Sequence, residues 1–189
     1  MVILASGSPR RRELMKQIVE EYSIITSDID EESSYYMSPL EAVLDIAKRK
    51  GEKVFNDHPN DIVVSADTIV VLDNKIIGKP VDEGDAKRIL HLLSGREHEV
   101  ITAYCIFSKG KMIENHVSSK VQFYELSDDL INRYVATGSP LDKAGAYGAQ
   151  DNDKEFPIVK KIKGSLTNVI GFPVEEIKRD FESIQQKRA

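Results

Sequence analysis

A turn of serine, glycine and arginine follows the first apolar run of the chain. Residues 2–5 are apolar, Ser6-Gly7-Ser8-Pro9 comes next, and Arg10, Arg11 and Arg12 follow. Because a serine hydroxyl can cap a helix and proline suits its first position, the pattern predicts a strand, a tight turn and a helix beginning at Pro9. Arginines in the first turn are unfavourable, because the N-terminal end of a helix dipole is already positive. A bound phosphate would accept hydrogen bonds from the free amides and from the guanidiniums together. The alternative is that the arginines lie along the surface or pair with carboxylates.

Asp67 is the one charged residue in the apolar run of residues 62–71, which lies within the most apolar segment of the sequence, residues 61–72. An ionised carboxylate in such a strand must meet a cation, a metal ion or good hydrogen-bond donors, because burial without them is costly. We therefore predict a functional role for Asp67. The alternative is a strand-end or bulge carboxylate that accepts hydrogen bonds from local amides.

Two further residues extend this candidate site. Glu31, between Asp30 and Glu32, could join Asp67 around Mg²⁺, which takes a few carboxylates together with phosphate oxygens. Lys79, in the loop Gly78-Lys79-Pro80, could neutralise a phosphate as a point charge. Taken alone, an acidic run is usually just solvated, and most loop lysines have no such role.

The stretch from Asp142 to Gln150 has the composition of a ligand-binding loop. Its two glycines allow a ligand to approach the backbone, and the Gln150 amide can hydrogen-bond a base edge. A surface loop is an equally good interpretation. The four histidines lack metal-ligand spacing, and His98 is interpreted as structural or as a support for the site. Cys105, the single cysteine, is interpreted as a core residue.

These residues require a scaffold of strands and helices. The patterns predict strands over residues 2–5, 22–26, 61–72, 75–77, 99–108, 112–126 and 156–162, and helices over 9–19, 39–54, 82–94, 127–137 and 174–186. Ser38 and Glu41 form a capping box at the second helix. The order fits a mixed sheet with flanking helices, in the α/β or α+β class, better than a strictly alternating doubly wound fold.

Composition limits the class of protein. A chain of 189 residues can form one large domain or two lobes sharing a sheet, and we predict a single domain over residues 1–189 with two lobes. The net charge of −5 argues against a dedicated nucleic-acid binder. No window approaches the ~18 apolar residues of a membrane span, and no basic region precedes an apolar one at the N-terminus. The default prediction is a cytoplasmic protein.

Motifs over nearly the whole chain resemble the Maf family, the septum-formation-inhibitor-like nucleoside triphosphate pyrophosphatases. In order, they are residues 4–11, Asp30-Glu31, Ala66-Asp67-Thr68, Gly78-Lys79-Pro80, Leu93-Ser94-Gly95 with His98 and Val100, residues 142–147, Gln150, Gly164-Ser165 and residues 169–173. The resemblance implies an elongated two-lobed α/β fold similar to that of inosine triphosphate pyrophosphatases, with a nucleotide cleft between the lobes. It also implies a divalent metal, Mg²⁺ or Mn²⁺, release of pyrophosphate and a nucleoside monophosphate, and, by family analogy, a homodimer.

The resemblance further implies a substrate class. The branch of the family that acts on dTTP and UTP carries Arg, Thr and Gln at three specificity positions, which here are Arg10, Thr68 and Gln150. A sister branch that acts on methylated GTP carries Trp, Gln and Glu there. The chain therefore resembles the pyrimidine type, with CTP and modified pyrimidine nucleotides as further candidate substrates, a house-cleaning role in the nucleotide pool and a link to cell division arrest.

Roles transfer by the same resemblance. Ser8, Arg10, Arg11 and Lys79 would hold the triphosphate, Asp67 would orient or deprotonate the attacking water, and Glu31 with Asp67 would hold the metal. The chain departs from the family after Gln150, where Asp151 replaces the usual glycine. The resemblance therefore leaves the path of this loop open.

Two rival functions follow from the same residues. The first is a non-catalytic nucleotide-binding regulator of septum formation that uses the same pocket. The enzyme is favoured because a pure binder has no need of Asp67 opposite the arginines and Lys79. The second is nucleic-acid binding, which the net acidity disfavours.

Overall fold

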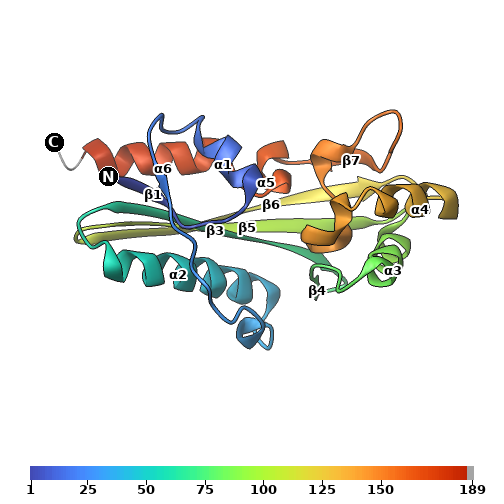
Figure 1. Cartoon of the computed structure of the whole chain (residues 1–189), viewed down its shortest axis with the longest axis horizontal. Coiled ribbons are helices and arrows are strands. Elements are labelled where there is room, and N and C mark those ends of the chain that lie inside the picture. The colour runs from blue at the N-terminus through green and yellow to red at the C-terminus, as the bar shows by residue number, and fades with distance from the viewer. Residues whose placement is uncertain (187–189) are drawn as a thin grey trace. The chain divides into compact units, whose positions relative to one another are not determined.

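Strands and amphipathic helices follow the order that the sequence predicts. The computed structural model describes residues 1–186 (Figure 1). Its elements, with 3₁₀ helices labelled η, are β1 (Val2–Leu4), α1 (Pro9–Met15), β2 (Ser23–Ile24), η1 (Glu32–Ser34), α2 (Pro39–Asp57), β3 (Ile62–Leu72), β4 (Lys75–Ile77), α3 (Glu83–Leu93), β5 (Glu97–Ser108), β6 (Lys111–Phe123), α4 (Asp128–Ala136), η2 (Ser139–Asp142), η3 (Ala144–Ala146), η4 (Ala149–Asp151), β7 (Val159–Lys163), α5 (Leu166–Ile170) and α6 (Val174–Gln186).

The strands form a mixed sheet, hydrogen-bonded in the order β2-β1-β3-β5-β6-β7, with β4 also paired to β3. β1 runs parallel to both β2 and β3, whereas β3 with β4 and β6 with β7 are antiparallel pairs. The predicted mixed sheet with flanking helices is confirmed.

The chain divides into two compact units. The first contains Met1–Thr68, Thr102–Val117 and the described residues from Gly171 onward, and the second contains Ile69–Ile101 and Ser118–Ile170. In the first unit, α1 and α6 cover one face of the strands and α2 covers the other (Figure 1). The core of the second unit is built from α3, α4 and the strand segments they cover, with Leu90, Leu93, Val121 and Phe123 at most 1% exposed.

Local capping signals set the starts of two helices near the site. The Ser8 hydroxyl accepts a hydrogen bond from the Arg11 amide at 3.4 Å, which caps α1. Ser38 and Glu41 form the predicted capping box of α2, in which each side chain accepts from the backbone amide of the other. Both starts agree with the sequence because the capping bond depends only on neighbouring residues.

Other boundaries differ from the predictions. α1 ends at Met15 instead of near Val19, because the amides of Gln17 and Ile18 bond to carbonyls three residues back and tighten the chain into a turn. β7 begins at Val159 and not at Phe156. The short helix α5 and the three 3₁₀ turns after Gly138 have no strong periodic signal, and the sequence predicts only a loop there.

Candidate active site

The parallel pairing of β1 with β3 places the serine–arginine turn, which follows β1, beside the middle of β3, where Asp67 lies. Leu4 of β1 is in register with Val64 of β3, and the amide of Ala5 donates to the Val64 carbonyl at 2.8 Å. The turn begins at the next residue, Ser6, and Asp67 lies three residues beyond Val64 on β3. The carboxyl end of β1 is therefore close to Asp67, although β3 itself continues to Leu72, and α/β proteins bind ligands beyond the carboxyl ends of parallel strands.

Asp67 and Glu31 share a single cation. The Nζ atom of Lys50, on α2, lies 2.9 Å from Oδ1 of Asp67 and 2.8 Å from Oε1 of Glu31. The side chains of Asp67, Lys50 and Glu31 are 9%, 15% and 35% exposed. The carboxylate in the apolar strand therefore meets a cation, as its burial requires.

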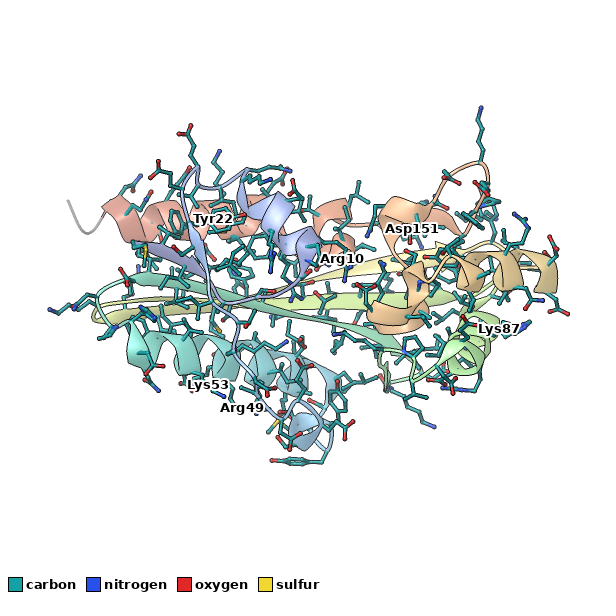
Figure 2. The ribbon with its side chains drawn as sticks, viewed as in Figure 1. Arg10, Tyr22, Arg49, Lys53, Lys87 and Asp151 are labelled. Carbon is teal, nitrogen blue, oxygen red and sulfur yellow. The ribbon has the colours of Figure 1, made fainter. Side chains whose placement is uncertain are left out.

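The segment that carries Glu31 is attached to α2 on both sides of that residue. Arg49 donates from Nη1 to the Asp30 carbonyl at 3.0 Å, from Nη2 to the Ser34 hydroxyl, and from Nε to the Asp45 carboxylate at 2.8 Å. Lys53, one turn further along, donates to the carbonyl of residue 28. Figure 2 labels Arg49 and Lys53 on this helix. We infer that Arg49 holds Glu31 in position.

Ser34 closes this group of contacts. Its hydroxyl donates to Asp45 at 2.6 Å, and the Ser34 side chain is buried. Hydrogen bonds from Ser34 and then from Arg49, together with the positive charge of Arg49, outweigh burial and hold the pKa of Asp45 below its usual range. The segment after Glu31 is thus fixed by charge-assisted hydrogen bonds.

Arg11 contacts three partners inside the first unit. Its Nη2 donates to the Thr68 hydroxyl at 3.0 Å, its Nε to the Gly171 carbonyl at 2.9 Å, and its Nη1 to the Ser6 hydroxyl at 3.4 Å. Burial, only partly offset by the negative charge of Asp67, lowers the pKa of the guanidinium. These bonds use three of the five N–H donors of an arginine and orient Thr68, whose hydroxyl also lies 2.8 Å from that of Thr102.

Tyr35 lies next to the two carboxylates, and its side chain is exposed. Partial burial, followed by the negative charges of Asp67 and Glu31, raises the pKa of its hydroxyl to about 12. The raised pKa reflects the negative charge that lies near this phenol.

The two carboxylates have the chemistry of a magnesium site. Mg²⁺ is commonly held by one or two carboxylates together with substrate phosphate oxygens, and Asp67 and Glu31 converge on one point that a cation already occupies, Lys50 Nζ. Within residues 1–186, no group of three or more His, Cys, Asp or Glu side chains could hold a metal ion. A pair that is completed by phosphates fits both observations.

Two predicted site residues belong to the second unit. Lys79 is exposed in the loop between β4 and α3, where the Gly78 carbonyl accepts a hydrogen bond from the Gly145 amide at 3.1 Å. Gln150 is exposed on η4. The contacts described above link Ser8, Arg11, Glu31, Asp67 and Thr68 in the first unit. Arg10, labelled in Figure 2, is the second residue of α1.

The pairing of Lys50 with Asp67 was not predicted from the sequence. The signal was present, because Lys50 continues the helical spacing of the buried residues Val43, Ile46 and Ala47 on α2. A lysine on the apolar face of a helix must find a partner or reach solvent. His98, by contrast, fits its structural interpretation: it is 3% exposed, and its Nε2 lies 2.6 Å from the Tyr147 hydroxyl.

The fold and the site define a class of protein. Two solved structures are similar to almost the whole chain. The Ham1 protein of Staphylococcus aureus has a TM-score of 0.54 and 10% sequence identity, over 97% of this chain and 98% of that one. A HAM1 protein from Coxiella burnetii has a TM-score of 0.51 and 12% sequence identity, over 98% of both chains. The protein is therefore a mixed α/β protein with the Ham1 fold, and it carries a carboxylate pair beside an arginine turn.

The sequence comparisons narrow the class to a family. The profile of the Maf-like proteins matches residues 1–184, so the chain belongs to the Maf family. A relative from Thermococcus gammatolerans is 44% identical over 94% of this chain and 93% of its own length, and one from Bacillus mycoides is 41% identical over 96% and 94%. Both relatives are named dTTP/UTP pyrophosphatase.

None of the helices within residues 1–186 has the length and apolar character that a membrane crossing requires.

Proposed function

We propose that this protein hydrolyses dTTP and UTP to the nucleoside monophosphate and pyrophosphate, with CTP and modified pyrimidine nucleotides as further substrates. The observation that carries the proposal is the buried carboxylate of Asp67, which shares the cation of Lys50 with Glu31 next to the Ser6–Arg11 turn. The names of the relatives support the same reaction. A house-cleaning role in the nucleotide pool would follow from it.

The reaction is a phosphoryl transfer to water. Asp67 would orient the water and take its proton while the water oxygen forms a bond to the α-phosphorus. The bond from that phosphorus to the oxygen bridging to the β-phosphorus breaks, and pyrophosphate leaves. This chemistry needs positioning and charge neutralisation more than covalent groups.

The basic and hydroxyl groups would hold the triphosphate. Ser8 and Arg10 lie at the start of α1, and Arg11 adds its remaining N–H donors. Lys79 would supply a further point charge. Arg10, Thr68 and Gln150 are the proposed base-specificity residues, and the contact from Arg11 fixes the Thr68 hydroxyl for that role.

Glu31 and Asp67 would hold the divalent ion, Mg²⁺ or Mn²⁺. Such an ion, when bound, neutralises phosphate oxygens and polarises the phosphoryl group. Lys50 contacts Oε1 of Glu31 and Oδ1 of Asp67, so it neutralises part of their charge and keeps them oriented, and the ion would be held through the other oxygens of the pair. We expect dialysis against EDTA to abolish turnover and added Mg²⁺ or Mn²⁺ to restore it.

A screen of common and modified nucleoside triphosphates, with identification of the products, tests the proposal. We expect dTTP and UTP to be the best substrates, and monophosphate with pyrophosphate to be the products. Diphosphate with inorganic phosphate would contradict the proposed position of cleavage. Tight dTTP binding without pyrophosphate release would instead favour the nucleotide-binding regulator of septum formation.

Several further expectations belong to this proposal. We place the enzyme in the cytoplasm, with a nucleotide as its partner, no role for nucleic acid, and a homodimer by family analogy. A single domain with two lobes and a nucleotide cleft also stays a prediction, as does a link to cell division arrest. Sedimentation of the purified protein at several concentrations tests the dimer.

A further inference from the structure

A network of hydrogen bonds surrounds Gln150 in the second unit. Oδ2 of Asp151 accepts from the Tyr134 hydroxyl at 2.7 Å and from the Ser139 hydroxyl at 2.6 Å. Hydrogen bonds from a hydroxyl to a carboxylate at this length are charge-assisted and strong. Asp151, labelled in Figure 2, is therefore tied to α4 and η2 at once.

The same hydroxyl also holds the other end of the turn that carries Gln150. Tyr134 is 2% exposed, and its oxygen accepts a hydrogen bond from the Gly148 amide at 3.1 Å. The Asp151 amide in turn donates to the Gly148 carbonyl at 3.0 Å. Residues 148–151 thus form a closed turn with both ends on one buried phenol. Burial and then the bond to Asp151 raise the pKa of that phenol, which keeps it a donor.

The absence of a side chain at Gly148 leaves room for the side chain of Gln150. A Cβ at position 148 would lie 2.9 Å from Nε2 of Gln150 and 2.9 Å from Cε of Lys143. Contacts this short require a side chain to move. Nζ of Lys143 bonds to the Ser139 carbonyl at 2.5 Å, to its hydroxyl at 3.1 Å and to Asp142 at 2.9 Å. Because Lys143 is held by three hydrogen bonds to two residues, Gln150 is the side chain that would move.

We propose that Asp151 and Gly148 are positioning residues for base recognition: together with Tyr134 they hold the amide of Gln150 in the orientation that reads a pyrimidine base. This inference rests on the proposed function, in which Gln150 is a base-specificity residue. The inference also assigns a role to Asp151, which stands at the position where the chain departs from the family pattern.

The readout is discrimination, measured as the ratio of kcat/KM for dTTP to kcat/KM for dGTP. A site whose polar group is displaced loses selectivity between substrates, and a misplaced hydrogen-bonding group typically costs on the order of tenfold or more. A variant that only destabilises the fold lowers the active fraction equally for both nucleotides and leaves the ratio unchanged. We expect Asp151→Ala, Tyr134→Phe and Gly148→Ala each to lower the ratio about tenfold, mainly through a higher KM for dTTP.

Two further variants complete the design. Tyr124→Phe, at an exposed tyrosine of the same unit, is matched to Tyr134→Phe and should leave the ratio unchanged. Asp151→Asn keeps an acceptor oxygen for Tyr134 and Ser139 and should retain more of the ratio than Asp151→Ala. The added methyl group of Gly148→Ala meets side-chain atoms of Gln150 and Lys143 and no backbone atom among its nearest neighbours, so it tests the proposal even if the Asp151 variants fold poorly.

A double-variant cycle separates this inference from the proposed function. If Asp151 acts through Gln150, then adding Asp151→Ala to Gln150→Ala should change the ratio no further. A wild-type protein without dTTP hydrolysis, or an unchanged ratio in Gln150→Ala, would contradict the proposed function. If Gln150→Ala lowers the ratio while Asp151→Ala, Tyr134→Phe and Gly148→Ala all keep the wild-type value, the positioning role is wrong.

Discussion

The ammonium group of Lys50 lies 2.9 Å from Oδ1 of Asp67, in the middle of the most apolar strand of the protein. It also lies 2.8 Å from Glu31. One lysine therefore pairs with two carboxylates that come from segments far apart in the sequence. The stability of the first unit and the geometry of the proposed site depend on the same cation.

Replacing Lys50 with methionine should destabilise the protein, because the buried carboxylate of Asp67 then lacks its cation. Removing one partner of a buried ion pair typically costs about 3 kcal/mol or more. Urea unfolding measures the change. Lys48→Met is the matched control, because Lys48 is 41% exposed and lies 4.0 Å from Glu52, and its loss should cost less than about 1 kcal/mol. Equal unfolding free energies for the two variants would show that the ion pair between Lys50 and Asp67 does not stabilise the protein.

Arg49→Ala should release the segment that carries Glu31. Amide exchange of residues 30–34 should become faster, because the variant loses the bonds to the Asp30 carbonyl and the Ser34 hydroxyl. We also expect kcat/KM for dTTP to fall by about tenfold to a hundredfold, since small misplacements of catalytic groups have effects of this size. Arg88→Ala removes an exposed pair with Asp85 and serves as the control. Unchanged exchange in Arg49→Ala would refute the positioning of Glu31 by Arg49.

The stability of the protein should depend on pH through His98. Burial lowers the pKa of His98 to about 4 in the folded protein, from an ordinary value of 6.5. The unfolded chain therefore binds a proton first as the pH falls. The stabilisation is complete above about pH 6.5 and is lost toward pH 4, by roughly 3 kcal/mol.

Urea unfolding at several pH values, with His98→Gln and His116→Gln, measures this dependence. The curve of His98→Gln should be flatter between about pH 6.5 and 4, and that of the exposed control His116→Gln should follow the wild type. Curves of equal slope for all three proteins would mean that His98 is not the group responsible.

Much of the fold follows from signals that lie within a few residues of each other. The helix caps at Ser8 and Ser38 are local signals and are predicted correctly. The turn at Asp73-Asn74, where both residues have positive φ, is also local and predicted correctly. The predicted end of α1 is wrong. The apolar residues Ile18 and Val19 continue the helical pattern in the sequence, but the backbone there has already tightened into a turn.

The site is less accessible to sequence reasoning. Asp67 stands out because a charge interrupts an apolar strand. Lys50 follows the apolar face of α2, but only the packing of strand and helix decides that it reaches Asp67. Arg11 contacts residues 57 and 160 positions away, at Thr68 and Gly171. Such contacts depend on strand pairing and chain path, which no short window of sequence contains. The roles of Asp67, Glu31 and the phosphate-binding residues stay predictions that need kinetic measurements.

The most direct test is the turnover of Asp67→Asn with dTTP and Mg²⁺. The substitution keeps the shape of the side chain and removes the base, so the variant should fold and bind dTTP while kcat falls by ~10²–10⁴. Asp73→Asn, at an exposed turn, is the control and should keep wild-type turnover. Binding of dTTP with kcat reduced at least a hundredfold is the result that we predict for Asp67→Asn. Near-normal turnover in that variant would remove Asp67 from the mechanism and contradict the account.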